Sequence, residues 1–584
     1  MLQEVAYYQP MRTLALVRRA LGEPWGGPDI AVPGLHTFSQ EDVRRAVTLL
    51  LRRAAYSLDA LPHCLDLLWE LGRDDARATN PLPDHPWRVL TDLMGYETHK
   101  PLVYNDLGLG AVRRWLAQPD AHTHARSPLQ ALTPLLEKSG TWTESRGFQL
   151  AIRSFIVSYT AVRELRESAI EILRDHLTHP DIRVAFRAVS ILGDALHGPL
   201  PYLNRAITPE ELSQWEPEQL CVLAALDQLV RADPHPLIRL QVINDVRFHA
   251  RNDRSEVVRA RAGEVLSHVR ADYDFQLTRM LVPRMSQWDF YDEDPDIPPA
   301  TGPSDRIRHG LERLRAEVIP EFWRRLPVPA DAAAELDRRV GALRDLEPQA
   351  SASFLVGDLL SAAPDRVAGF AEYILGRPDG PAAECFPACL SVLQAHDPAQ
   401  AVVLATRAVA GGSIPLGRVV ANYYQWRHDL RSPVAEAEIE LIESFLRHPD
   451  AGVRRSGAGA LRTVARHSPW RAVAIARTVA VGTDGELAAE LCGLADPVAQ
   501  GVPDFFGDYD VRWLVDQLRD VNNLDHHILR FLEFAVTRVP DAVVELLVGR
   551  IASRESTIYD GRFHPLPYDG LPWVFHVLEG SPAH

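Results

Sequence analysis

Residues that could perform chemistry occur in this sequence only in incomplete sets. Asp292, Asp294 and Asp296 have the spacing that opens a calcium-binding loop. Such a loop needs a glycine at its sixth position and a glutamate at its twelfth, where this chain has Ile297 and Pro303. The stretch is therefore expected to be a solvated acidic loop rather than a calcium site.

Other chemical motifs fail in the same way. Cys385 and Cys389 could form one zinc-binding pair, but no second pair of ligands accompanies them. Lys138 and Ser139 match the last two residues of a nucleotide-binding loop. The residues before them contain no glycine, which such a loop needs to surround a phosphate. We therefore predict that the protein is not an enzyme, with no catalytic residue, metal or cofactor. Two isolated histidine pairs are expected to be surface or helix-capping residues: His122 with His124, and His526 with His527.

The element that organises the chain is a turn followed by a helix, seen most clearly over residues 448–461. Val453, Gly457 and Leu461 recur there at steps of four, so they fall on one face of a helix. Asp450 precedes the helix, where its carboxylate can accept hydrogen bonds from the first free backbone N–H groups. The small side chains of the apolar face predict a second helix packed closely against it.

The same turn and helix recur elsewhere in the chain. Residues 255–266 form a second good copy, and residues 179–192 and 235–246 form partial ones. The unit resembles one half of a HEAT-type helical hairpin, which cannot bury its apolar face alone and must stack on its neighbours. We predict an all-α fold, a HEAT/armadillo-like helical-repeat solenoid.

A second regularity follows in the C-terminal half, where helices are expected to begin at prolines. Four prolines precede apolar residues at steps of three and four, and their separations of 34 (398 − 364), 71 (469 − 398) and 71 (540 − 469) residues fit a period near 35. That period is in the range of two-helix repeats. The prolines are Pro364, Pro398, Pro469 and Pro540, with Pro433 and Pro503 near the missing midpoints.

Three local expectations concern the first half. Residues 95–110 are predicted to be a turn-rich connection that leads to a helix at 111–116, and the helices are expected to be regular from about residue 128. In the helix predicted over residues 162–177, apolar residues form one stripe. Its charged residues are expected on the opposite side: Arg163, Glu164, Arg166, Glu167 and Asp175.

The Pro-rich and acidic stretch 288–304 is the most loop-like part of the chain, so the main boundary is placed there. The predicted parts are an N-terminal helical region (1–130), HEAT-like repeats (131–287), a loop or linker (288–304), further repeats (305–555) and a C-terminal cap or tail (556–584).

Composition excludes several classes of protein. A chain of 584 residues is too long for one compact core. The net charge of −16 makes nucleic acid an unlikely partner, because phosphate binding draws on a surplus of Lys and Arg. Five scattered cysteines are expected to be buried in a reducing compartment. Neither a signal peptide nor a membrane-spanning apolar run is recognisable, so a cytoplasmic protein without a membrane partner is predicted.

Several short sequence segments are similar to the helical C-terminal region of bacterial STAND-type NTPases. The resemblance implies a repeat array that senses a ligand, in antiphage defence or other signalling. The chain begins where such a region would begin and lacks the NTPase module, so it could be a stand-alone sensor, a partner of a separate or upstream NTPase, or a truncated reading frame. The segments are Val5-Ala6-x-Tyr8-x-Pro10, residues 14–17, residues 67–72, Asn80 with His85-Pro86, and residues 563–567.

The function predicted from these observations is a non-catalytic protein-interaction scaffold or ligand-sensing module. Its predicted binding residues are Arg455, whose counterparts differ between copies, and Arg562, Phe563 and His564 in the aromatic tail. The tail could instead cap the last repeat. Two alternatives stay open: a nucleic-acid-binding protein of the DNA glycosylase type, with arginines gathered in one groove, and a helical-repeat lyase with a deep polar pocket.

Overall fold

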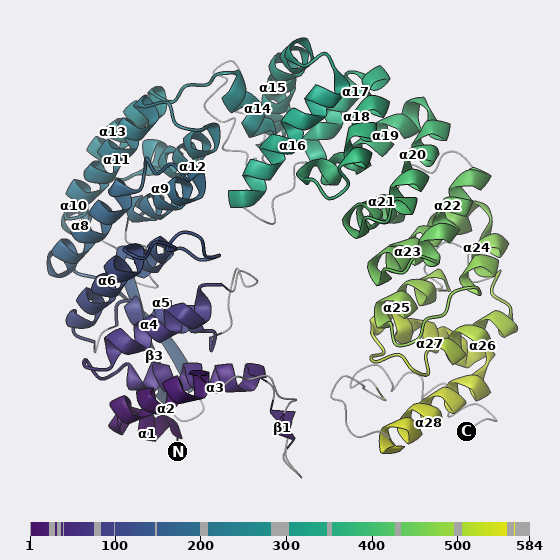
Figure 1. Ribbon diagram of the computed structural model, residues 1–584, viewed down its shortest axis with the longest axis horizontal. Coiled ribbons are helices and arrows are strands. Elements are labelled where there is room, and N and C mark those ends of the chain that lie inside the picture. Colours follow the sequence, from purple (N-terminus) through teal and green to yellow (C-terminus); the bar gives the residue numbers. More distant parts are fainter. Residues whose placement is uncertain are drawn as a thin grey trace. The chain divides into compact units, whose positions relative to one another are not determined.

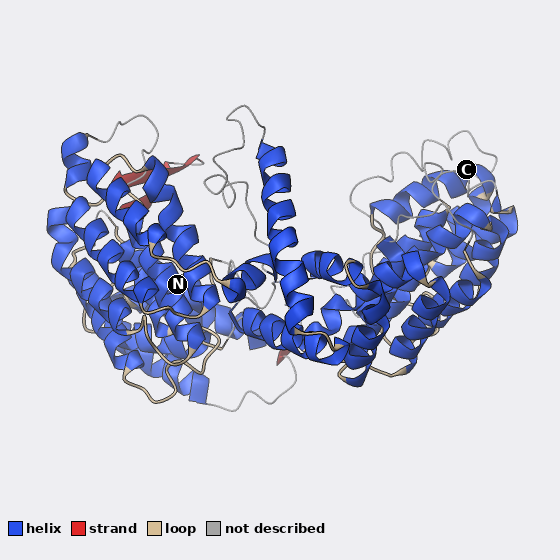
Figure 2. Ribbon diagram, turned by 90° about the horizontal axis from the view of Figure 1, so that it is seen from above, coloured by secondary structure: helices blue, strands red, loops and turns tan. Residues whose placement is uncertain are grey.

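The computed structural model divides the chain into two compact units, unit 1 (Met1–Arg279) and unit 2 (Met280–His584). Nearly all of the structure is helical (Figure 2), which confirms the predicted all-α helical-repeat fold. No described helix is long and apolar enough to cross a membrane. The structure describes residues 2–22, 30–31, 37–38, 40–74, 83–97, 100–146, 149–198, 208–281, 303–346, 353–426, 434–495, 505–556 and 566.

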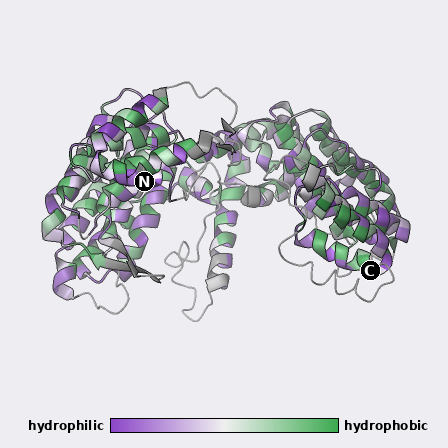
Figure 3. Ribbon diagram, turned by 90° about the horizontal axis from the view of Figure 1, so that it is seen from below, coloured by the Kyte–Doolittle hydropathy of each residue, from purple (hydrophilic) through white to green (hydrophobic). Residues whose placement is uncertain are grey.

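In unit 1, five helices form two packed layers (Figure 1). One layer holds α8 (Tyr159–Asp175), α11 (Glu216–Arg231) and α13 (Glu256–Ser267), and the other holds α9 (Ile182–Leu196) and α12 (Pro236–Asn252). Hydrophobic and hydrophilic residues alternate along the helices (Figure 3), and the buried residues of these five helices are largely apolar. Each helix therefore buries its apolar stripe only because a neighbour covers it.

The remaining elements of unit 1 precede or connect these layers. They are α1 (Leu2–Tyr8), α2 (Pro10–Gly22), β1 (Ile30–Ala31), β2 (Thr37–Phe38), α3 (Gln40–Ala54), α4 (Leu61–Gly72), α5 (Pro86–Met94), α6 (Val103–Leu116), the 3-10 turn η1 (Pro128–Leu132), α7 (Thr133–Leu136), β3 (Ser139–Arg146), β4 (Gln149–Ile156), α10 (Pro209–Ser213) and α14 (Tyr273–Leu281), which spans the boundary between the units.

Unit 2 also consists of two layers of helices. The first holds α17 (Ser353–Ser361), α19 (Phe386–His396), α21 (Ile414–Trp426), α23 (Ala451–His467), α25 (Gly485–Leu494) and α27 (His526–Arg538). The second holds α16 (Pro329–Leu346), α18 (Val367–Gly376), α20 (Pro398–Ala410), α22 (Glu436–Leu446), α26 (Asp508–Gln517) and α28 (Pro540–Ser556). The other elements are α15 (Pro303–Arg325), the 3-10 turns η3 (Pro364–Arg366) and η4 (Pro381–Cys385), and α24 (Pro469–Ala476).

The repeated turn is held by its histidine as well as by its aspartate. Before α23, the Asp450 side chain accepts a hydrogen bond from the backbone N–H of Val453 at 3.1 Å. Nδ1 of His448 accepts one from the N–H of Asp450, also at 3.1 Å. The same Nδ1 bond occurs at three further His-Pro sequences, before α5, α9 and α12: His85, His179 and His235.

The small residues of the repeat permit the close packing that they predict. A Cβ atom added to Gly457 of α23 would lie 2.7 Å from Cβ of Phe445 in α22. The predicted proline starts are also confirmed, because α20, α24 and α28 begin at Pro398, Pro469 and Pro540, and Pro364 begins η3 just before α18. Pro433 and Pro503 lie outside the described residues.

Two local predictions are wrong. The second half of the turn-rich connection expected over residues 95–110 is helix, since α6 begins at Val103. Gly108 suits this helix because a Cβ there would lie 3.3 Å from Cγ of Met94. The regular helices expected from residue 128 are interrupted by the antiparallel pair β3 and β4, in which Ser139 lies opposite Ile156. Both strands are rich in the Thr, Trp, Phe and Ile residues that favour extended chains.

The predicted boundary and tail fall largely on residues that are not described. Of the stretch 288–304, only Pro303 and Ser304 are described, and they begin α15. The division between the units falls between Arg279 and Met280. Of the tail, Ser556 ends α28, and Leu566 is the one other described residue.

Candidate protein-binding groove

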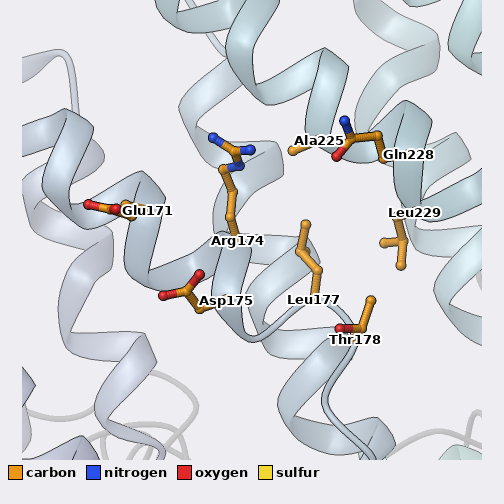
Figure 4. A pocket seen from close by; sticks show the side chains of 8 residues that line it. All are labelled: Glu171, Arg174, Asp175, Leu177, Thr178, Ala225, Gln228 and Leu229. Atoms are coloured by element: carbon orange, nitrogen blue, oxygen red, sulfur yellow. The ribbon is translucent and has the colours of Figure 1, made fainter.

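A groove in unit 1 separates α8 from α11. It consists of two adjoining hollows of about 500 Å³ and 310 Å³, which share Glu171 and Arg174 of α8. Figure 4 shows the smaller hollow, with Glu171, Arg174 and Asp175 on one side and Gln228 and Leu229 of α11 on the other. The groove is open, because α11 packs along α13 but touches α8 much less.

The floor of the groove is apolar. Ile170 of α8 and Ala225 and Leu229 of α11 line the hollows and are almost fully buried. Each of them presents only a small part of its surface to the groove, because the rest of the side chain packs in the core of the unit. An apolar side chain of a ligand would therefore lose water against this floor.

The rim of the groove on the α8 side is acidic. Its carboxylates recur at steps of three and four, which places them on one stripe of the helix. Glu167 is paired with Arg163, whose Nε lies 2.7 Å from Oε1. Among the residues that the structure describes, no cation pairs with the other three, and Arg174 is the one arginine that lines the groove. The three unpaired carboxylates are Glu164, Glu171 and Asp175.

A buried ion pair connects α8 to α11 beneath the floor. Nε and Nη2 of Arg166 donate to the two carboxylate oxygens of Glu218 at 2.8 and 2.7 Å. Nη1 of Arg166 donates to the backbone oxygens of Leu135 and Glu137, each at 3.0 Å. Burial alone would lower the pKa of Arg166, but the hydrogen bonds and charge of Glu218 raise it. The bidentate geometry gives both side chains charge-assisted hydrogen bonds in place of water.

Lys138 completes this buried cluster. Its Nζ donates to the backbone oxygen of Ala195 at 2.8 Å and lies 3.8 Å from Oε1 of Glu218. Burial lowers the pKa of Lys138 to about 7, and Glu218 offsets part of that effect. Nζ of Lys138 and Cζ of Arg166 each lie 4.9 Å from the ring centroid of Trp215, close enough for cation–π attraction. The cluster sets the spacing of the two groove walls.

The structure corrects two sequence-based expectations at this site. Arg166 was expected on the solvent side of its helix but is fully buried, because Glu218 and two carbonyl groups replace water around it. Cys221 was expected to be buried but is exposed, and it lines the groove. The other four cysteines are buried as predicted. Burial raises the pKa of Cys64 to about 12 and raises that of the remaining three.

No family model matches the chain. No curated protein matches it either. Among solved structures, an engineered protein is similar over 81% of this chain and 99% of its own, at 13% identity and a TM-score of 0.25. A TM-score this low carries no information about shared architecture. The resemblance to the repeat region of STAND-type NTPases therefore stays a prediction.

Arg455, the one predicted binding residue that the structure describes, does not line the groove. Nε of Arg455 is 2.9 Å from Oδ1 of Asp484, and its Nη1 bonds to Glu486, so its guanidinium links α23 to the start of α25. Arg562, Phe563 and His564 lie outside the described residues. The groove residues did leave a signal, because acidic residues recur along one side of the sequence of α8. The same pattern is also typical of a solvent-exposed helix. Only the position of α11 shows that this stripe is the rim of a groove.

The histidine pairs also differ from expectation in part. His526 and His527 begin α27 and are exposed. His122 is not isolated, because its ring centroid lies 5.5 Å from that of His176 and 5.2 Å from that of His179. Burial, together with the charges of the two neighbouring rings, lowers the pKa of His122 to about 4. Within the described part of the chain, no group of three His, Cys, Asp or Glu residues could hold a metal ion.

Proposed function

We propose that the protein is a non-catalytic binding module and that its groove takes a cationic, amphipathic segment of a partner protein. The observation that carries the proposal is the combination of an apolar floor with three unpaired carboxylates on one rim. Apolar side chains of the segment would cover Ile170 and Leu229, and its Lys or Arg side chains would pair with the rim.

The expected affinity is moderate. Exposed ion pairs contribute about 0.2–1 kcal/mol each, and apolar burial contributes about 25 cal/mol per Å². Ordering of the ligand and of its side chains opposes both terms. The sum points to dissociation constants on the order of micromolar, typical of a transient interaction.

The wider role is proposed on the resemblance. A HEAT-type array would act as the sensor part of a STAND-type signalling system and would work with a separate or upstream NTPase. In such a system the groove would bind a protein ligand. The DNA glycosylase alternative gains no support from this groove, because carboxylates along α8 would repel phosphates.

A synthetic peptide tests the proposal. A labelled helical peptide about 18 residues long, with leucines on one face and arginines on the other, is about 27 Å long and matches the groove. We expect fluorescence anisotropy to show binding that weakens as salt is raised. The same peptide with glutamates in place of the arginines should not bind.

Matched variants locate the binding. E164K/E171K/D175K should weaken binding of the cationic peptide by at least about 10-fold, because three attractive contacts become repulsive. D106K/E440K/E533K changes the net charge equally at exposed acidic residues that do not line the groove and should bind like the natural chain. Equal binding by both triple variants would exclude the groove as the site.

A further inference from the structure

A helix at the N-terminal end of unit 1 has the properties that the groove selects. On α2 the side chains of Met11 and Leu16 are 49% and 64% exposed, and Tyr8 just before it is 78% exposed. Arg12 and Arg18 are exposed on the same helix. The sequence of α2 contains no acidic residue. This surface is named the α2 face and consists of Tyr8, Met11, Arg12, Leu16 and Arg18.

One side of α2 is buried. Thr13, Leu14 and Val17 lie on that side, where α2 packs against α1 and α3. Several large apolar side chains gathered on one surface indicate an interaction site. Tyr, Met and Arg are the residue types enriched in protein interfaces, whereas Asp and Glu are depleted there.

We propose that a second copy of this chain occupies the groove, with its α2 face as the ligand. The cations of one surface match the unpaired carboxylates of the other, and both surfaces are apolar between their charges. The 13 residues of α2 span about 20 Å, and the 17 residues of α8 that form the wall span about 26 Å. The helix therefore fits within the length of the groove.

The ligand helix must come from another molecule. Within one chain, α2 is packed against α1 and α3 and makes no extensive contact with α8 or α11. Moving it into the groove would expose Leu14 and Val17, which are 1% and 2% exposed where they lie. A second copy presents the same face without any unfolding.

The proposed contact is heterologous, because two different surfaces of the chain meet. After the first contact one molecule keeps a free groove and the other keeps a free α2 face, so association continues into chains or closes into a ring. This inference rests on the proposed function of the groove and names one partner for it. A monomeric chain that still binds the synthetic cationic peptide would refute the inference alone.

Sedimentation velocity of the full chain from about 1 µM to about 100 µM tests the inference. We expect the average sedimentation coefficient to rise with concentration and to fall when salt is raised. R12E/R18E should weaken association by at least about 10-fold, because two attractive contacts become repulsive. L16E should also weaken it. All three positions are exposed, and circular dichroism should show unchanged helix content.

Mixing two variants identifies the surfaces. R12E/R18E keeps an intact groove, and E164K/E171K/D175K keeps an intact α2 face, so a mixture permits one contact and should stop at dimers. Either variant alone should stay monomeric. Association of the natural chain that survives in either variant, or a natural chain that is monomeric at every concentration, would overturn the proposal.

Discussion

Nε of Arg455 lies 2.9 Å from Oδ1 of Asp484, the residue that caps the N-terminus of the next helix in the same layer. Arg418, at the equivalent position of α21, makes the same contact with Asp450 at 2.8 Å. The arginine of one repeat thus supports the helix cap of the next. A residue that looked variable in sequence is part of the contact between repeats.

Removal of this contact gives the first prediction. R455A should lower the free energy of unfolding of unit 2 by about 0.5–1 kcal/mol, because the guanidinium is partly exposed and water replaces part of its contribution. Chemical denaturation measures the change. R447A removes a pair within one helix, between Arg447 and Glu443, and should cost less. Equal effects would show that the contact between repeats adds nothing.

The buried pair under the groove should be far more sensitive. R166A removes the bidentate partner of the buried Glu218 carboxylate and leaves Lys138 beside it, with Nζ 3.8 Å from Oε1, and we expect a loss of about 3–5 kcal/mol in unfolding free energy. R166M/E218L removes both charges of the pair at similar volume. Above pH 7 Lys138 can lose its proton, so the double variant should recover most of that loss there. Denaturation curves of the natural chain and of both variants give the comparison. A double variant as unstable as R166A would contradict this account.

The buried Lys138 should make the stability of the protein depend on pH. Its pKa is lowered to about 7 in the folded chain and is about 10.4 when unfolded. Between these values the unfolded chain binds the extra proton, so the contribution of Lys138 to stability rises with pH and is lowest below pH 7. Stability measured from pH 6 to pH 10 should therefore show an upward component that K138M lacks. An identical pH profile in both proteins would refute the shift.

Cys221 offers a direct probe of the groove. It is exposed, and the other four cysteines are buried. In the folded chain a thiol reagent should modify Cys221 quickly and the others only after denaturant is added. C221S should remove the fast reaction. The cationic peptide should slow it in the natural chain, and full reactivity at saturating peptide would place the peptide elsewhere.

Gly457 tests the close packing of the repeat. A Cβ there would lie 2.7 Å from Cβ of Phe445 and 3.3 Å from the backbone nitrogen of Leu446, so G457A should destabilise unit 2 by about 1–3 kcal/mol. G110A places the same methyl group in α6, where no atom lies within 4 Å, and should stabilise unit 1 by about 0.5–1 kcal/mol. Thermal or chemical denaturation of the two variants provides the test.

The helices and their tendency to stack could be predicted from local patterns in the chain. Periodic apolar residues, prolines at helix starts and aspartate caps stabilise structure within one or two helical turns. They can therefore be recognised in the sequence without knowledge of distant contacts. Val453, Gly457 and Asp450 take the roles that their spacing predicts. Local patterns were less reliable where propensities conflict, as in the glycine-containing helix α6 and in β3 and β4.

Which charged residues are buried, and where the surface is hollow, depends on contacts between segments far apart in the sequence. Arg166 and Glu218 are 52 residues apart, and nothing near either one in sequence distinguishes it from a solvated charge. The groove exists because α11 lies at a distance from α8 that the buried cluster of Arg166, Lys138 and Glu218 sets. Its acidic rim is an ordinary helix surface until α11 supplies the opposite wall, because a groove is a property of two helices rather than of one.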